Sequence, residues 1–296
     1  MKITKPFYAM AAVAALLITG CGTEESQTAS SPTTSAAAPD RASADGKGFY
    51  APINGLQLYY EVHGAGRPLV LLHGGLGTAD TTFVALLPEL AKTRKVITVD
   101  LQAHGHTGDI DRPLRFELMA DDISGLITHL GLGKADVLGY SLGGGVALQL
   151  AGRHPELVGR QVVISAPFRS DGWTPEGQAG MAALNPDTML ETPIHALYTA
   201  TAPNPANWSA LVTKTRQLLT ESYDWTAQVA AIRVPTLLVL AESDVVRPQH
   251  AEELGALLGG ARIAVAPGTT HYDMMYRADL LLPAITPFLE QATTPK

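Results

Sequence analysis

Apolar and polar positions form a pattern from Phe49 onward that alternates between strands and helices. Short unbroken apolar runs are typical of strands buried on both faces of a sheet, and a turn at Asn54–Gly55 precedes a hairpin strand at 56–62. The other predicted strands are 69–72, 96–99, 135–139, 162–164, 236–240 and 262–265. Apolar residues at helical spacing predict helices at 83–91, 116–130, 142–153, 251–258 and 280–291. This alternation predicts an α/β fold with a mostly parallel sheet flanked by helices.

Residues 168–232 interrupt the alternation. They contain no clear buried strand, and they hold all three tryptophans of the chain: Trp173, Trp208 and Trp225. An insertion of this size between two strands predicts a mainly helical cap that covers or supports a site. We expect most of the tryptophans to form the core of the cap, with one or two facing a cavity.

The first 20 residues have the pattern of a bacterial export signal. Lys2 and Lys5 precede an apolar stretch at 9–18 that is too short for an ordinary bilayer-spanning helix. Cys21 follows in a segment that resembles the lipobox of bacterial lipoproteins, which implies cleavage before this cysteine and its acylation. The alternative is a plain secretory signal with an incidental cysteine. The resemblance predicts a lipid-anchored protein of the bacterial cell envelope, outside the cytoplasm.

A polar segment separates this signal from the patterned part of the chain. Residues 22–48 contain no Val, Ile, Leu, Met, Phe, Trp or Tyr, so they have too little apolar surface to offset the entropy of ordering. We therefore interpret residues 21–48 as the acylated cysteine and a disordered tether, and residues 49–296 as the folded domain.

Composition and charge indicate a protein with a substantial core and argue against several kinds of partner and site. The chain has 296 residues, 46% of them apolar, which is enough for a substantial core. Its formal charge of −7 disfavours contact with the phosphates of nucleic acids. Cys21 is the single cysteine, so an internal disulfide and a cysteine-based zinc site are excluded.

A strong local signal for chemistry is the segment Gly139–Gly143, which reads G-x-S-x-G between a predicted strand and a predicted helix. A sharp turn there exposes the hydroxyl of Ser141 at a helix N-terminus, where backbone N–H groups favour developing negative charge. A serine needs a base to act as a nucleophile, and that base needs an orienting carboxylate. Asp244 follows the predicted strand 236–240, and His271 follows the strand 262–265. The ligand sites of open α/β sheets lie at these strand ends.

On these residues the sequence resembles the α/β-hydrolase superfamily over 49–296, most closely its capped, serine-dependent esterase and lipase-like members. The resemblance implies a triad of Ser141, Asp244 and His271. It also implies that the backbone N–H groups of Gly75, in the loop His73–Gly77, and of Leu142 bind the oxyanion.

Several alternatives stay open on the sequence. Asp171, after the predicted strand 162–164, is the second candidate for the acid, and His250 is the second candidate for the base. The loop Asp100–Thr107 resembles the family pattern Asp-x-Arg-Gly-x-Gly-x-Ser, but Gln102 replaces the arginine and Ala103 the glycine. The ion pair of that arginine is therefore not expected.

The same loop permits an interpretation as a metal site. It would combine His104 and His106 with Asp100, Asp109 and Asp111, in partial resemblance to metallo-β-lactamase-like hydrolases. The aspartate and third histidine of that pattern are missing, so we interpret the two histidines as solvated side chains of an exposed loop.

The sequence thus predicts a serine hydrolase, with a carboxylic ester as the favoured substrate and no cofactor or metal. The acyl substrate is expected to be small and apolar, because the cap carries Trp173, Met181, Met189, Trp208 and Tyr223. No nucleic-acid partner and no obligate protein partner are expected, and membrane contact would be through the lipid anchor. The alternatives are a hydrolase of carbon–carbon bonds, an enzyme similar to proline iminopeptidases, and a non-catalytic binding protein of the same fold.

Overall fold

The computed structural model describes residues 40–291. The predicted signal at 1–20, the predicted acylation site Cys21 and the tether up to residue 39 lie outside the described residues. Among the described residues, no helix is both long and apolar enough to cross a bilayer.

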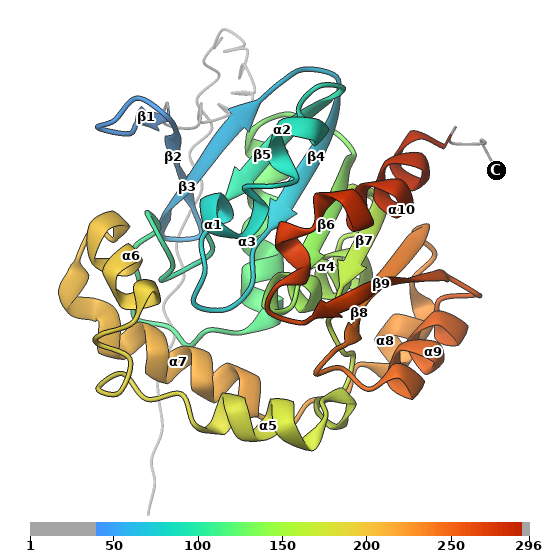
Figure 1. The fold of residues 1–296 in the computed structure, drawn as a ribbon. Coiled ribbons are helices and arrows are strands. Elements are labelled where there is room, and N and C mark those ends of the chain that lie inside the picture. The colour runs from blue at the N-terminus through green and yellow to red at the C-terminus, as the bar shows by residue number, and fades with distance from the viewer. Residues whose placement is uncertain (1–39, 292–296) are drawn as a thin grey trace, which may run out of the picture. The chain divides into compact units, whose positions relative to one another are not determined.

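The centre of the fold is a nine-stranded sheet with the order β1-β2-β3-β5-β4-β6-β7-β8-β9 (Figure 1). The strands β1, β2 and β3 pair antiparallel, and β3 also pairs antiparallel with β5, whereas the pairings from β5 to β9 are parallel. The mostly parallel sheet expected from the sequence is therefore confirmed. The strands are β1 (Arg41–Ala42), β2 (Phe49–Ile53), β3 (Leu56–His63), β4 (Arg67–Leu72), β5 (Arg94–Val99), β6 (Ala135–Tyr140), β7 (Val158–Ile164), β8 (Thr236–Ser243) and β9 (Arg262–Thr270).

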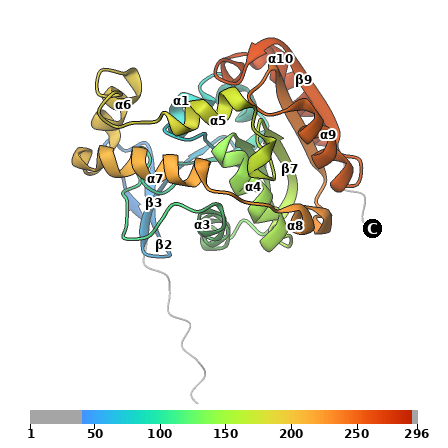
Figure 2. The ribbon, with the colours of Figure 1, turned by 90° about the horizontal axis from the view of Figure 1, so that it is seen from below.

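Helices cover both faces of the sheet. The α-helices are α1 (Ala79–Phe83), α2 (Leu87–Leu90), α3 (Phe116–His129), α4 (Leu142–Arg153), α5 (Pro175–Ala182), α6 (Pro193–Thr201), α7 (Trp208–Thr220), α8 (Thr226–Ala231), α9 (Pro248–Leu257) and α10 (Ala278–Glu290). Three short 3₁₀ helices lie at Ser170–Gly172, Pro205–Asn207 and Met274–Tyr276. Helices α3, α4 and α8 pack on one face, and α1 and α10 pack on the other (Figure 2).

The strand β4 shows why the buried strands are apolar at every position. Val70 and Leu72 belong to the core under α3 and α4, whereas Leu69 and Leu71 belong to the core under α1 and α10. Successive side chains of a strand point to opposite faces, so a strand covered on both faces has no solvent-facing positions.

The prediction of one helix at 83–91 is wrong. The chain forms α1, which ends at Phe83, and then α2, which begins at Leu87. Thr78 caps α1, since its side chain accepts a hydrogen bond from the N–H of Thr81. Pro88 lies in the first turn of α2, where its missing N–H costs no hydrogen bond, whereas in the interior of a longer helix it would break one.

The expected start of the domain at Phe49 is also corrected. Arg41 and Ala42 form β1 and pair with β2, and Asp40 accepts hydrogen bonds from Tyr60 and, at 2.6 Å, from His129 Nε2. The segment from Asp40 to Gly48 therefore belongs to the folded domain. Its stability comes from backbone pairing and polar contacts, which a search for apolar residues does not detect.

The cap is shorter than the predicted insertion 168–232. Helices α5, α6 and α7 form a layer beside the body of the fold (Figures 1 and 2). The last part of the insertion belongs to the body, because Trp225 packs edge-on against Phe116 of α3 at 5.0 Å between ring centroids and Val229 of α8 lies in the main core.

Candidate active site

Ser141 lies on a sharp turn between β6 and α4. Its backbone has φ 52° and ψ −115°, a conformation that is strained for a residue with a side chain. Hydrogen bonds on both sides hold the turn: the N–H of Ser141 donates to the carbonyl of Ile164 at 2.8 Å, and the N–H of Gly143 donates to that of His73 at 3.0 Å. A Cβ atom on Gly143 would lie 2.1 Å from the carbonyl oxygen of Leu72, so only glycine lets the turn approach β4 this closely.

A hydrogen-bonded relay extends from Ser141, as the sequence predicts. His271 Nε2 is 3.1 Å from Ser141 Oγ, and His271 Nδ1 is 2.9 Å from Asp244 Oδ1. Since the carboxylate is an acceptor, the Nδ1 atom carries the proton, and Nε2 is free to accept the proton of the serine hydroxyl. The three residues follow the ends of β6, β8 and β9, which explains how positions 130 residues apart meet.

Asp244 accepts hydrogen bonds from three donors besides His271. Its Oδ2 atom accepts from the hydroxyl of Ser165 and, at 2.9 Å, from the N–H of Ala241, while the N–H of Val246 donates to Oδ1 at 3.1 Å. Burial alone would raise the pKa of this carboxyl, but the hydrogen bonds from His271, Ser165 and Ala241 lower it below its ordinary value. Asp244 is therefore held as a carboxylate.

Sequence reasoning missed Ser165. This residue directly follows β7, at the same edge of the sheet as Ser141, and its backbone has a φ of 51°. Its position in the sequence could have indicated it, because Ser165 is a polar residue directly after a buried strand, as Asp244 and His271 are.

Two backbone donors lie beside the relay. The N–H groups of Gly75 and Leu142 donate no hydrogen bond to any residue within 40–291. A Cβ atom on Gly75 would lie 3.5 Å from the side chain of Leu142, so the two predicted oxyanion residues are neighbours. Unpaired N–H groups at a helix start and in an adjacent loop are suited to bind a developing oxyanion.

His73 holds the loop that carries Gly75. Its Nδ1 atom donates to the carbonyl of Gly74 at 2.7 Å, and its Nε2 atom accepts from the N–H of Leu101 at 3.0 Å. Burial is the main cause that lowers the pKa of His73, which keeps the ring neutral with both nitrogen atoms engaged. The ring thus ties the loop after β4 to the loop after β5.

The second candidates lie away from the relay. Asp171 is exposed and pairs with Arg169 at 3.1 Å. His250 is buried against Phe168, and its Nε2 atom accepts from the N–H of that residue at 3.2 Å. Burial lowers the pKa of His250 to about 4. Neither residue contacts Ser141 or His271.

The loop after β5 is held by protein contacts and differs from the expectation of solvated histidines. His104 is completely buried, its Nδ1 atom lies 2.8 Å from the carbonyl oxygen of Gln102, and burial lowers its pKa to about 3. His106 pairs with Asp100 at 2.9 Å. Within residues 40–291, no group of three His, Cys, Asp or Glu side chains is placed to hold a metal ion.

Gln102 replaces the arginine of the family pattern, but an arginine from another part of the chain contacts it. Arg112 Nε donates to Gln102 Oε1 at 2.6 Å, and the same guanidinium pairs with Asp122. The amide of Gln102 also donates to Asp109 at 2.9 Å, and Asp109 pairs with Lys214 of the cap helix α7 at 2.6 Å. The loop therefore links the body of the fold to the cap.

A cavity of about 270 Å³ opens on Ser141 and His271, and we call it the catalytic cavity. Of the apolar cap residues noted in the sequence, Trp173, Met181 and Met189 line it. The other two pack within the protein: Trp208 packs on Tyr198, and Tyr223 stacks on Trp225 at 4.4 Å between ring centroids. The wall of the cavity is predominantly apolar.

Comparison with known proteins identifies relatives of the chain. The model of the alpha/beta hydrolase family matches residues 69–284. The putative carbamate hydrolase RutD of Azorhizobium caulinodans is 29% identical over 241 residues, which are 75% of this chain and 91% of that protein. The 2-hydroxymuconate semialdehyde hydrolase of Pseudomonas sp. (strain CF600) is 41% identical over 106 residues, which are 35% of this chain and 38% of that protein. The crystal structure of E-2-(acetamidomethylene)succinate hydrolase superposes with a TM-score of 0.66 at 24% identity, covering 82% of this chain and 99% of that one, which supports the fold.

Proposed function

The chain belongs to the alpha/beta hydrolase family, and on that basis we propose that it is a serine hydrolase that cleaves a carboxylic ester or a related acyl bond. The observation that carries this proposal is the relay at 3.1 Å and 2.9 Å between Ser141, His271 and Asp244, at the end of a cavity beside two unpaired N–H groups.

In the proposed mechanism, Ser141 Oγ attacks the carbonyl carbon of the substrate while His271 Nε2 accepts its proton. The N–H groups of Gly75 and Leu142 bind the negatively charged oxygen, and each such donor typically contributes about 3–4 kcal/mol. His271 then donates the proton to the leaving group, and an acyl-enzyme remains. Water hydrolyses this intermediate, with His271 again as the base, and Asp244 stabilises the protonated ring in both steps.

A series of 4-nitrophenyl esters of increasing acyl length tests the proposal. The wild-type protein is expected to release 4-nitrophenol with a maximum at short or medium chains, because the catalytic cavity of about 270 Å³ is small and apolar. Ser141→Ala is expected to lower kcat by at least 10⁴-fold. Equal rates for both proteins would contradict the proposal.

Cleavage of a carbon–carbon or carbamate bond is the second candidate, since the named relatives are a 2-hydroxymuconate semialdehyde hydrolase and a putative carbamate hydrolase. The same relay suits both reactions. A protein that turns over 2-hydroxymuconate semialdehyde or carbamates faster than any ester in matched assays would favour this candidate. The proline iminopeptidase-like alternative predicts cleavage of prolyl arylamides, and a binding protein predicts no turnover of any of them.

We also propose that the protein is anchored in the bacterial cell envelope through Cys21, on the basis of the lipobox-like segment that precedes it. Acyl chains bind membranes because each buried methylene contributes about 0.8 kcal/mol. Cys21→Ala should move the full-length protein from the membrane fraction to the soluble fraction. Unchanged retention in the membrane would contradict acylation as the anchor.

A further inference from the structure

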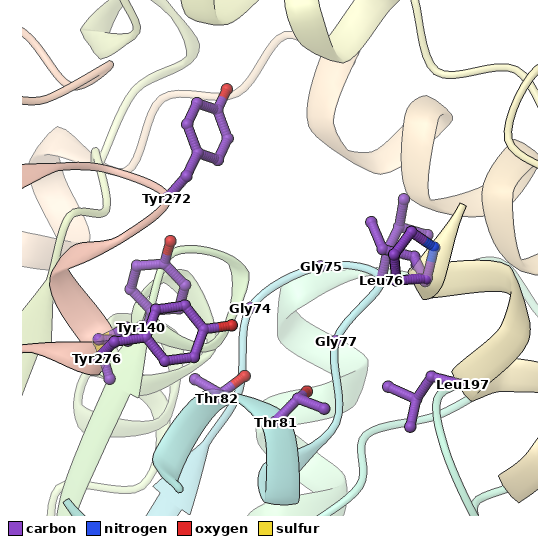
Figure 3. Close-up of a pocket in the computed structure, with 13 residues that line it drawn as sticks. Gly74, Gly75, Leu76, Gly77, Thr81, Thr82, Tyr140, Leu197, Tyr272 and Tyr276 are labelled. Carbon is purple, nitrogen blue, oxygen red and sulfur yellow. The ribbon is translucent and has the colours of Figure 1, made fainter. Parts of the chain in front are cut away.

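A second cavity of about 360 Å³ lies next to the catalytic cavity, and we call it the side chamber (Figure 3). The two cavities share six lining residues: Gly74, Gly75, Leu76, Tyr140, Ile194 and Tyr272. They therefore meet at the loop that carries the unpaired N–H of Gly75. A substrate whose carbonyl lies at this loop has room for one arm in each cavity.

The walls of the two cavities differ in chemistry. The catalytic cavity is closed by apolar cap residues, among them Met181, Leu184 and Leu219. The side chamber has Thr81 and Thr82 on one wall, with Tyr276 on one side of them, Leu197 on the other, and Tyr272 farther from the two threonines (Figure 3). Its wall thus combines hydroxyl groups with aromatic rings.

Three of these hydroxyl groups have no hydrogen-bond partner among residues 40–291. Thr82 is 8% exposed, and its backbone N–H bonds to Thr78 while its hydroxyl bonds to no described residue. The hydroxyls of Tyr272 and Tyr276 likewise form no hydrogen bond to a described residue, and both rings are exposed at the chamber. The hydroxyl of Thr82, on the wall of the side chamber, is therefore available to hydrogen-bond to a ligand.

Within the part of the chain that the structure describes, neither cavity has an arginine or lysine side chain that could pair with a carboxylate group of the substrate. Of the described residues that line them, none is Arg, Lys, Asp or Glu. The basic residues of the cap helix α7 are engaged elsewhere: Lys214 pairs with Asp109, and Arg216 donates to the carbonyl of Leu184 at 3.3 Å. The chain as a whole is acidic, with a charge of −7. A carboxylate in either cavity would be desolvated without a counter-charge, which is costly.

We propose that the substrate is uncharged in both arms, and that the side chamber binds an arm with hydrogen-bonding groups while the catalytic cavity binds an apolar arm. This inference rests on the proposed hydrolase function and specifies its substrate class. The hydroxyls of Thr82 and Tyr276 select the polar arm, and the lack of cationic side chains on the walls excludes acids of the same shape.

Two esters that differ only in charge test the selection: mono-4-nitrophenyl adipate and its methyl ester. The wild-type protein is expected to cleave the methyl ester with a kcat/KM at least 100-fold higher. Values within threefold of each other would overturn the inference, while leaving the proposed function intact. If neither ester is cleaved, and 4-nitrophenyl butyrate is not cleaved either, the proposed function itself fails.

Variants of the side chamber test where the polar arm binds. Leu197→Arg places a cation on the chamber wall and is expected to raise kcat/KM for the free acid at least tenfold, whereas Leu197→Gln, of similar size, leaves it unchanged. Thr82→Val keeps the shape and removes the hydroxyl. It is expected to lower kcat/KM for the methyl ester five- to tenfold and to leave 4-nitrophenyl hexanoate unchanged. Rescue of the acid by Met189→Arg in the catalytic cavity, but not by Leu197→Arg, would overturn this placement.

Discussion

The hydroxyl of Ser165 donates to Asp244 Oδ2, the carboxylate oxygen that His271 does not contact. This bond links the end of β7 to the relay, so four strand ends rather than three position the chemistry. Because hydrogen bonds to the charged form of a carboxyl lower its pKa, Ser165 helps to keep Asp244 ionised.

Ser165→Ala is therefore expected to lower kcat about tenfold with little change in KM. It should also shift the acidic limb of the pH–rate profile to higher pH, because the pKa of Asp244 rises when it loses a donor. Steady-state kinetics between pH 4 and 8 measure both effects. Ser165→Gly is the control, since glycine accepts the φ of 51° without strain and also lacks the hydroxyl. If Ser165→Gly had wild-type activity, the loss of activity in Ser165→Ala would come from backbone strain and not from the missing hydroxyl.

Gly143→Ala is expected to destabilise the protein by at least ~3 kcal/mol, because its Cβ would lie 2.1 Å from the backbone carbonyl oxygen of Leu72. Gly108→Ala is the matched control, since a Cβ there would meet no atom within 4 Å. Urea unfolding of both variants measures the difference. Equal stabilities would show that the turn does not depend on close packing against β4.

The pair Lys214–Asp109 fastens the cap helix α7 to the loop after β5 at 2.6 Å. Lys214→Met is expected to cost about 1–3 kcal/mol, because it leaves a largely buried carboxylate without its cation, and to raise KM by loosening the cap. Lys92→Met removes an exposed pair with Glu89 and should cost less than ~1 kcal/mol. If Lys214→Met lost no more stability than Lys92→Met, the pair Lys214–Asp109 would not fasten the cap to the body.

The pair His106–Asp100 predicts a dependence of stability on pH. The hydrogen bond to Asp100 raises the pKa of His106 above its ordinary value of 6.5. The stabilisation is therefore fully present below about pH 6.5 and is lost as the pH rises through the elevated pKa. The difference in unfolding free energy between the wild type and His106→Ala should shrink from pH 6 to pH 8. A difference that grows over this range would contradict the assignment.

The sequence predicted the residues whose positions follow from topology. Ser141, Asp244 and His271 each follow a strand of a parallel sheet, so their proximity follows from the strand order. Contacts between segments without a pattern were not predictable. Asp40 bonds to Tyr60 and His129 across many residues, and Arg112 reaches Gln102 from a loop, although neither contact leaves a periodic signal in the sequence.

The extent of the cap shows the same limit. The interruption of the strand–helix pattern at 168–232 predicted an insertion, but spacing does not reveal which face a short helix packs on. Helix α8 packs on the body because Val229 reaches the main core and Trp225 meets Phe116. The tertiary contacts of these side chains therefore determine where the cap ends.

Intact-mass spectrometry after treatment with a fluorophosphonate probe tests whether His271 activates Ser141 as a nucleophile. Each wild-type molecule is expected to carry one covalent adduct, located on Ser141, and Ser141→Ala is expected to carry none. His271→Ala should react at least 100-fold more slowly. If the folded wild-type protein stayed unlabelled, or if Ser141→Ala were labelled equally, Ser141 would not be the activated nucleophile.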